Sequence, residues 1–430
     1  MSSGHMSGAA SQLQAQRGIA DDAQAHYDDV MRISKGTATP DLLRLATRHA
    51  GSTIDWLMAS GFEMGPECPV IAYSHEPYRV ARTYWGTHKG LSILKVLQPL
   101  LDDAVKDGLV DLRLNTRLVD LQPGSQGQGW TATCGGAADQ YEVNAKNVVL
   151  ATGGYGGNPQ LFSRLTGGYP LLSPAPACAD GSGLELGLAL GGQVRNSDVY
   201  LPTVAGVPDQ AGGHYVNWDR RSNLTPQHRK PWEIYVTVQG ERFVAEDDPS
   251  PDARERALKR QPQLAFWVVF DEAIFAQAPC LFTGTDKSEV LARFGTHLAY
   301  QRADTLDGLA AACGMDAPTL QRTVAQYNTA VAQGKDLLGR THLPAPIAQG
   351  PFYAIRHQGV TLRCWAGLEV DASLRVVGRN GEPMKGLYAV GEILGGAAMS
   401  GDSFASGMSI TPALTFGRLL GSDWLNWQNA

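Results

Sequence analysis

One glycine-rich stretch near the C-terminus, Gly386–Arg418, constrains the fold more than any other part of this chain. It begins with a short apolar run, Leu387–Val390, which predicts a strand, and it ends with a helical pattern from Ser409 onwards. Between the two, several glycines allow the backbone to pass close to a flat ligand: Gly391, Gly395, Gly396, Gly401 and Gly407. The helix start offers unpaired backbone N–H groups and the positive end of the helix dipole. The stretch therefore predicts a site for an electron-rich ligand, in which Glu392 is placed to accept hydrogen bonds from ribose-type hydroxyls.

This stretch resembles the C-terminal flavin-binding signature of the fumarate reductase and succinate dehydrogenase flavoprotein superfamily. The family pattern runs strand, Gly-Glu, Gly-Gly, a variable loop and a helix ending in Phe-Gly-Arg. Three further motifs occur in the family's order: Asn147–Asn158, Ala179–Gly187 and Gly359–Asp371. The resemblance covers nearly the whole chain and implies that the cofactor is FAD. It also implies an α/β fold, in which a Rossmann-like FAD-binding domain (residues 1–199 and 351–430) carries an inserted α+β capping domain (residues 200–350).

The resemblance further implies which residues contact FAD. Motif by motif, this role falls to Ser3, Gly4, His5, Leu118, Ala151, Thr152, Gly153, Gly154, Asp180, Gly391, Glu392, Ser409 and Ile410. No metal site is predicted, because the six cysteines are scattered and form no Cys-x-x-Cys pair.

The N-terminal part departs from the family pattern, which normally starts with a strand, a Gly-x-Gly-x-x-Gly turn, a helix and a second strand. None of these is present, and Ser2–Ser11 resembles the small-residue loop that follows the second strand in the family. By analogy with the βαβ unit and its loop, the chain is expected to begin about 35 to 45 residues inside the family pattern. Two interpretations stay open: a truncated sequence, or a second chain that supplies the missing N-terminal FAD-binding unit.

Composition and charge limit the partners. The chain has 36 basic and 42 acidic residues, a formal net charge of −6, so it lacks a basic field for nucleic acid and a small-molecule substrate is expected. No apolar run approaches the roughly 20 residues of a membrane span, so no integral membrane segment is predicted. The lack of a signal peptide in Met1–Gln12 and the scattered cysteines predict a cytoplasmic protein.

The resemblance also directs attention to catalysis. Enzymes of this family move a hydride between flavin N5 and a carbon β to a carbonyl or carboxylate, while protein groups handle the α proton and hold the developing enolate. Where fumarate reductases carry catalytic histidines and arginines, this sequence has Tyr200, Ser250 and Arg363, and the loop Met399–Phe404 has no cation. Simple fumarate reduction is therefore not expected. Tyr200 and Arg363 are the predicted catalytic residues for another substrate.

Substrate identity stays open at this stage. The C-terminal loop is similar to those of tricarballylate dehydrogenase and ketosteroid dehydrogenase types, which leaves an acidic and a polycyclic substrate as alternatives. Two irregular segments are candidates for the pocket, Pro66–His88 and the stretch with His214, Arg220 and Arg221, although each could equally be a surface crossing. The leading prediction is an FAD-dependent oxidoreductase acting on CH–CH bonds. The alternative is a non-catalytic or split flavin-fold subunit.

Overall fold

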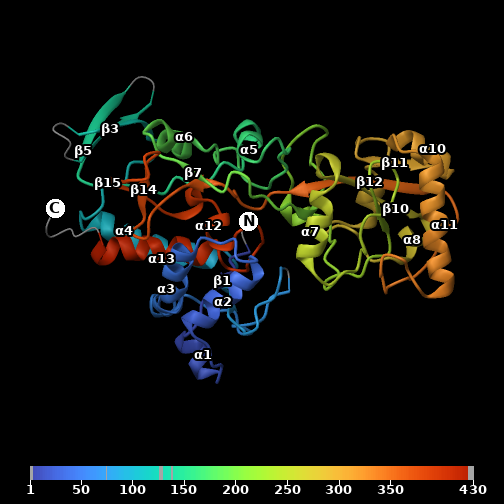
Figure 1. Cartoon of the computed structure of the whole chain (residues 1–430), viewed down its shortest axis with the longest axis horizontal. Coiled ribbons are helices and arrows are strands. Elements are labelled where there is room, and N and C mark those ends of the chain that lie inside the picture. The colour runs from blue at the N-terminus through green and yellow to red at the C-terminus, as the bar shows by residue number, and fades with distance from the viewer. Residues whose placement is uncertain (1–2, 74, 125–128, 137–138, 425–430) are drawn as a thin grey trace.

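The computed structural model describes residues 3–73, 75–124, 129–136 and 139–424. Figure 1 shows two lobes side by side: the first contains helices α1–α6, α12 and α13, and the second contains α7–α11. Each lobe has its own hydrophobic core. The mixed α/β fold predicted from the sequence is thereby confirmed.

A small sheet in the first lobe carries the two glycine motifs predicted to bind FAD. Its strands lie in the order β14 (Arg375–Val377), β15 (Pro383–Ala389) and β6 (Val148–Leu150). β15 and β6 run parallel, with Leu387 opposite Val148. Because parallel strands end at the same edge of a sheet, the glycines that follow β6 and β15 lie near each other. Among the described residues, β6 has β15 as its one strand partner, so its other edge is unpaired.

The rest of the first lobe surrounds this sheet. Its helices are α1 (Gln12–Gln16), α2 (Ala23–Ile33), α3 (Pro40–Ala59), α4 (Leu91–Lys106), α5 (Pro159–Leu165), α6 (Ser182–Ala189), η4 (Gly391–Leu394), α12 (Ala397–Ser400), α13 (Ile410–Leu419) and the terminal π-helical turn η5 (Leu420–Trp424). Its other strands are β1 (Met6–Ser7), β2 (Thr83–Tyr84), β7 (Val194–Arg195), β13 (Gly367–Leu368) and the antiparallel meander β3 (Arg117–Pro123), β4 (Trp130–Gly135) and β5 (Gln140–Ala145).

Helix α3 connects this surrounding layer to the cofactor side of the lobe. Its apolar residues recur at helical spacing and are buried, for example Leu43, Ile54 and Leu57. α3 packs against both α2 and α13. The hydroxyl groups of Thr53 and Thr415 lie 3.0 Å apart across the contact with α13. This packing fixes the direction of α13, whose N-terminal end faces the predicted cofactor site.

The second lobe is built on a five-stranded sheet. The strands lie in the order β11 (Tyr300–Ala303), β12 (Phe352–Val360), β10 (Ala265–Asp271) and β9 (Ile234–Val236), and β8 (Thr203–Gly206) also pairs with β12. The helices are η2 (Trp218–Arg220), α7 (Pro251–Lys259), η3 (Pro262–Leu264), α8 (Glu272–Gln277), α9 (Lys287–Leu291), α10 (Leu306–Cys313) and α11 (Ala317–Gln333). Every residue of β10 is buried, so the sheet lies inside the lobe. The predicted limits of a capping domain, residues 200–350, stay a prediction.

Apolar residues at helical spacing predict a helix over Pro40–Ala59, which has these bounds in the structure, and the helix predicted near Ser409 begins at Ile410. The residue pattern also predicts strands over Val110–Gln122 and Arg242–Ala245, and both predictions are corrected. In the first region pairing begins only at Arg117, and the second is reduced to one bridge, between Val236 and Arg242. In both regions, local β-propensity was not matched by a neighbouring strand to pair with.

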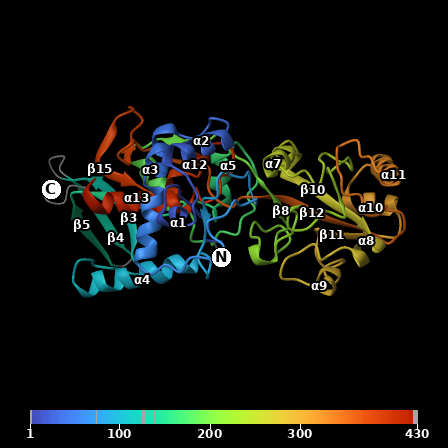
Figure 2. The same ribbon diagram turned by 90° about the horizontal axis from the view of Figure 1, so that it is seen from below.

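One end of the first lobe exposes an unusually apolar face. Among the described residues, most of the exposed large hydrophobic side chains lie between positions 91 and 149: Leu91, Leu94, Leu100, Val105, Leu109, Val110, Leu112, Leu114, Val119, Val143 and Val149. They belong to α4, to the segment 109–114 that follows it, to the meander and to β6, and α4 and the meander lie at the same end of the lobe in Figures 1 and 2. Clusters of exposed apolar side chains are typical of surfaces that bind another element or a partner.

Candidate functional site

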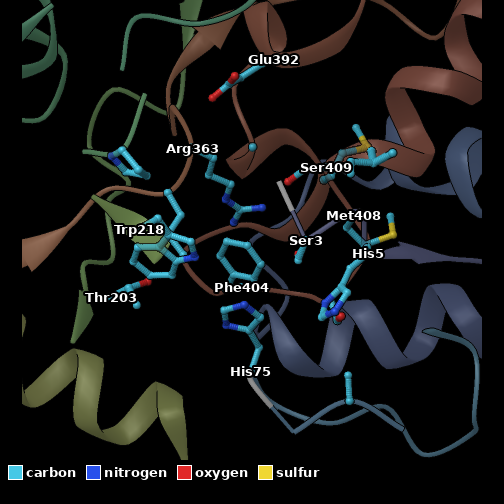
Figure 3. Close-up of a pocket in the computed structure, with 18 of the residues that line it drawn as sticks. Ser3, His5, His75, Thr203, Trp218, Arg363, Glu392, Phe404, Met408 and Ser409 are labelled. Carbon is cyan, nitrogen blue, oxygen red and sulfur yellow. The ribbon is translucent and has the colours of Figure 1, made fainter. Parts of the chain in front are cut away.

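A cavity of about 1040 Å³ lies between the two lobes. The first lobe contributes its N-terminal segment and the start of α13, and the second lobe contributes Thr203 and Trp218. Figure 3 shows these side chains around one space, with Arg363 and Phe404 at its centre. The cavity therefore combines the predicted cofactor segments with residues that the sequence did not associate with them.

Six of the predicted FAD contacts lie together in the lining of this cavity, and we call this part of the lining the flavin wall. They are Ser3, His5, Gly391, Glu392, Ser409 and Ile410. The N-terminal segment is held there because the Ser7 N–H donates to Thr411 Oγ1 at 2.8 Å. A Cβ at Gly407 would lie 2.3 Å from the backbone of Met6 and Ser7, so only glycine permits this approach. Gly4, between Ser3 and His5, has a φ of +74° and lies against the backbone of Lys89 and Gly90.

The wall has the properties expected of a flavin-dinucleotide site. Gly391 has a φ of +82° and no side chain near it closer than the Ala413 Cβ at 4.0 Å, so it leaves open space beside the cavity. At the start of α13 the Thr411 N–H donates to the Gly407 carbonyl at 3.2 Å and Pro412 has no N–H, so α13 offers the cavity mainly the positive end of its dipole, at Ser409 and Ile410. Glu392 accepts a hydrogen bond from the Cys364 N–H at 2.8 Å, which fixes the direction of its carboxylate. The residues present therefore fit FAD.

The other predicted FAD contacts lie outside the cavity lining. Ala151 and Thr152 follow β6 directly and are exposed. Asp180 forms an ion pair with Arg117 at 3.0 Å and accepts from the Ser182 N–H at 2.8 Å. The remaining three positions are Leu118, Gly153 and Gly154, of which Gly154 is buried against Cys364 and Glu392. These residues do not line the cavity themselves, although Gly154 lies against Glu392, which does.

Arg363 is the main charged group at the centre of the cavity. Its side chain is buried, and its guanidinium lies 4.4 Å from the ring centres of both Trp365 and Phe404. Nη2 donates to the Ser403 carbonyl at 2.8 Å, whereas Nε and Nη1 have no hydrogen-bond partner in the described part of the chain. Burial lowers the pKa of Arg363 to about 10, so the group stays positively charged at neutral pH. Two unsatisfied donors on a buried cation are ready to bind an oxygen of a ligand.

Tyr200, the second predicted catalytic residue, does not line the cavity. It lies in the core of the first lobe, with its ring 5.3 Å from those of Phe162 and Tyr169. Its hydroxyl lies 2.9 Å from Thr361 Oγ1, and burial raises its pKa. The family pattern gave its position along the chain, but the side chain points into the core. This placement corrects the expectation that Tyr200 faces the substrate.

Ser250, at the position where the family carries its proton-donating arginine, has a structural role. Its hydroxyl accepts from the Ala253 N–H at 3.1 Å as the N-cap of α7, and it donates to Glu76. Ser250 does not line the cavity. This finding agrees with the expectation that it cannot donate a proton to a substrate.

The two irregular candidate segments meet the cavity in part. Residues 70–73, His75 and Trp85 of the first segment line it, and so does Arg221 of the second, whereas His214 and Arg220 do not. His75 stacks on Phe404 with ring centres 3.7 Å apart, and burial lowers its pKa to about 3, so it is neutral. Sequence reasoning missed Thr203 at the start of β8, Trp218 at the start of the short 3₁₀ helix η2 and Asn223 in a loop, because these short segments have no periodic signal.

The comparisons with known proteins agree with this geometry. Residues 1–406 match a family model described as "FAD binding domain". Fumarate reductase (cytochrome) of Shewanella frigidimarina is 27% identical over 428 residues, which cover 98% of this chain and 70% of that protein. The open conformation of a flavocytochrome c3 fumarate reductase has a TM-score of 0.70 at 24% identity, over 99% of this chain and 71% of that one. The 3-ketosteroid delta1-dehydrogenase of Sterolibacterium denitrificans has a TM-score of 0.72 at 20% identity, over 97% and 90%.

The fold and the cavity together define a flavoprotein with a nucleotide-binding lobe and a second lobe beside it. The chain belongs to the FAD binding domain family, and its cofactor is FAD. It is an FAD-dependent oxidoreductase of the fumarate reductase and succinate dehydrogenase superfamily, as the sequence predicted. No helix in the described ranges has the length and apolar character to cross a membrane.

Proposed function

We propose that this chain desaturates or reduces a carbon–carbon bond next to a carbonyl or carboxylate, with residues 200–350 acting as the capping domain over the substrate. Bound FAD supplies the hydride acceptor or donor at N5. The observation that carries the proposal is Arg363, a buried guanidinium with two unsatisfied donors beside the flavin wall. The relatives, which include enzymes named fumarate reductase and urocanate reductase, support the same type of reaction.

In this proposal, Arg363 binds the carbonyl oxygen of the substrate. Negative charge grows on that oxygen when the neighbouring carbon loses a proton, or when hydride is added to the carbon beyond it, and a fixed cation stabilises this charge more in the transition state than in the ground state. Trp365, Phe404 and the Ser403 carbonyl hold the guanidinium in place before the substrate arrives. The guanidinium therefore needs little rearrangement when the charge develops.

Fumarate itself is not the proposed substrate. Ser250 caps α7 outside the cavity, and the loop of residues 399–404 adds no cation. We expect FAD-loaded protein to reduce fumarate more slowly than about 1 s⁻¹, the lower end of ordinary enzyme rates. The measurement is reoxidation of photoreduced flavin after fumarate is added without oxygen. Fumarate-dependent reoxidation at enzymatic rates would contradict the proposal, whereas reoxidation by another conjugated carbonyl compound supports it.

A second proposal concerns completion of the FAD site. We infer that a βαβ unit, joined to this chain or present as a second chain, pairs with the free edge of β6 and covers the exposed apolar face. The unpaired edge, the exposed Val149 and the exposed residues Ala151 and Thr152 support this inference. A parallel strand beside β6 would place a glycine-rich turn next to these residues, where it could bind the pyrophosphate. The alternative of a non-catalytic subunit then predicts that completion restores FAD binding without any flavin-linked turnover.

A further inference from the structure

A loop without any cation of its own holds the Arg363 side chain. This loop, residues 401–404, follows α12 and contains Ser403, whose carbonyl accepts from Arg363 Nη2 at 2.8 Å. The ring of Phe404, the next residue, lies 4.4 Å from the guanidinium (Figure 3). A Cβ at Gly396 would lie 2.5 Å from Cδ and 2.6 Å from Nε of Arg363, so the backbone before α12 also touches the side chain. We call residues 401–404 the seat of Arg363.

Two side chains of α7 hold this seat from the second lobe. In Figures 1 and 2, α7 is the helix of that lobe nearest to the first lobe. Asp252 Oδ1 accepts from the Ser403 hydroxyl at 2.7 Å. Arg256, one turn later, forms a bidentate ion pair with Asp402, with Nη1–Oδ2 and Nη2–Oδ1 distances of 3.0 and 3.1 Å. Because Asp402 and Ser403 are neighbours in the chain, α7 binds both sides of the peptide unit next to the carbonyl that Arg363 uses.

Asp252 joins the seat to a further segment of the first lobe. Its Oδ2 accepts from Arg256 Nε at 2.8 Å and from Lys35 Nζ at 2.6 Å, and Lys35 follows α2. Burial alone would raise the pKa of Asp252, but hydrogen bonds from the two cations and from Ser403 lower it, so the carboxylate is charged at neutral pH. One charged group therefore connects α7, the seat and the end of α2.

The first lobe also supports the seat directly. Thr37 Oγ1 accepts from the Asp402 N–H at 3.0 Å. Gly401 has a φ of +56°, and a Cβ there would lie 2.7 Å from the Thr37 carbonyl carbon, so only glycine permits this approach. The seat is thus enclosed by segments of both lobes. Without its contacts to α7 it would keep the first-lobe contacts alone.

The position of the seat decides where Arg363 can bind a ligand. A guanidinium is planar, so the directions of its free donors are fixed once one nitrogen is bound and the plane is set. The Ser403 carbonyl binds Nη2, which leaves Nε and Nη1 of Arg363 without partners in the described part of the chain. A displacement of about 1 Å in a group that contacts the reacting atoms can lower the rate by about 10²-fold.

We propose that Asp252 and Arg256 are positioning residues for Arg363. By holding the seat, they direct the two free donors of the guanidinium into the cavity. Since α7 belongs to the second lobe, Arg363 is correctly placed only while the two lobes are in contact at α7. This inference rests on the proposed function, in which Arg363 binds the substrate. It adds two residues outside the cavity lining that determine this contact.

The test is a sulfite titration of the FAD-loaded protein, which includes the βαβ unit if residues 1–430 alone do not retain FAD. Sulfite adds reversibly to N5 of oxidised FAD and removes its visible absorbance, and a cation beside the flavin stabilises the added negative charge. Arg363→Gln should weaken sulfite binding by at least about 10-fold. Asp252→Asn and Arg256→Gln should each weaken it by about 3- to 10-fold, because Arg363 stays charged but loses its direction.

A double substitution separates positioning from a general loss of stability. In the Arg363→Gln protein, Asp252→Asn should weaken sulfite binding by less than about 2-fold, because no guanidinium is left to position. The matched control is Asp371→Asn. Asp371 accepts from Arg375 Nε at 2.8 Å with the i,i+4 spacing of Asp252 and Arg256, but its hydrogen bonds are to residues 373–375. This control should change sulfite binding by less than about 2-fold.

Crystal structures of the FAD-loaded Asp252→Asn and Asp371→Asn proteins give a readout that does not depend on sulfite. The contact between Arg363 Nη2 and the Ser403 carbonyl should be lost in the first and kept in the second. Thermal unfolding identifies a variant that fails to fold, and Arg256→Gln takes the place of Asp252→Asn in that case. An unchanged seat, an equal loss of sulfite affinity in the control, or an undiminished effect of Asp252→Asn in the Arg363→Gln protein would each overturn the inference.

Failure of the proposed function would look different. Sulfite binding that is absent, or unaffected by Arg363→Gln, would count against Arg363 beside the flavin and so against the proposed function, while the crystal structures would still decide whether α7 positions Arg363. Sulfite binding that depends on Arg363 but not on Asp252 or Arg256 would agree with the proposed function and refute the positioning role.

Discussion

Two strands of the first lobe, β15 and β6, each lead into a glycine motif that is predicted to bind FAD. The surroundings of the two strands in the structure differ. β15 has a strand on each side, and Leu387 within it is fully buried. The residues after β15 line the cavity. β6 is paired on one side, Val149 is 38% exposed, and Ala151 and Thr152 directly after it are exposed. The comparison teaches that a strand–glycine motif creates a binding site only where neighbouring chain closes around it.

The largest expected effect is on FAD affinity, when a βαβ unit is added at the unpaired edge of β6. A glycine turn and helix beside β6 would add two or three charge-assisted hydrogen bonds to the pyrophosphate, together about 4 to 6 kcal/mol. FAD should therefore bind residues 1–430 alone roughly 10³- to 10⁴-fold more weakly than the same residues combined with a βαβ unit.

Fluorescence titration of FAD with and without the added unit measures this difference, and a unit with its turn glycines replaced by valine is the control. We also expect residues 1–430 alone to be poorly soluble or colourless after purification. A yellow, stable monomer of these residues with stoichiometric FAD would show that the site closes in another way.

The next effect compares two predicted catalytic residues that the structure separates. Arg363→Ala removes a donor to the developing oxyanion, so the rate should fall by roughly 10²- to 10³-fold. Tyr200→Phe loses one core hydrogen bond to Thr361, which costs about 1 kcal/mol of stability and leaves the rate nearly unchanged. Single-turnover flavin reoxidation and thermal unfolding measure the two effects. An equal loss of rate in both variants would mean that Tyr200 takes part in the reaction.

A third pair of substitutions compares the strands themselves. Leu387→Ala in β15 should cost about 2 to 5 kcal/mol of unfolding free energy, because it opens a cavity in the core. Val149→Ala in β6 should cost less than about 1 kcal/mol, because its side chain is already in water. Chemical denaturation of both variants checks the difference. If Val149→Ala lowered the unfolding free energy as much as Leu387→Ala, the Val149 side chain would have to be covered by another element.

The last comparison tests the second-lobe side of the cavity through pH. The folded-state pKa of Glu255 is raised to about 8 by burial, above its ordinary value of 4.5. Between these values the unfolded chain has released the proton and the folded chain still binds it, so stability falls as pH rises, by at most about 1.4 kcal/mol per pH unit. Glu255→Gln should remove this part of the slope in denaturation curves between about pH 5 and 8. An unchanged slope would mean that Glu255 is solvated.

The segments of the flavin wall could be located from the sequence because their signals are local. A glycine with positive φ at 391, an acid at 392 and a helix start at 410 depend on their own neighbours in the chain. Arg363 came from the family resemblance, and the structure places it in the lining of the cavity. Tyr200 was misplaced because a pattern gives the position of a residue but not the side of the chain to which it points. Trp218 and Asn223 come from a short 3₁₀ helix and a loop, whose course is set by long-range contacts that no periodicity records.

The connection between the lobes gives Arg363 a mechanical property. β12 belongs to the sheet of the second lobe and ends at Val360, only three residues before Arg363. Thr361 at this junction is anchored to Tyr200, in the core of the first lobe. A tilt of the second lobe would therefore pivot at Thr361 and act on the guanidinium through a very short lever. A substrate that contacts only the second lobe would then change the position of the Arg363 guanidinium without touching it.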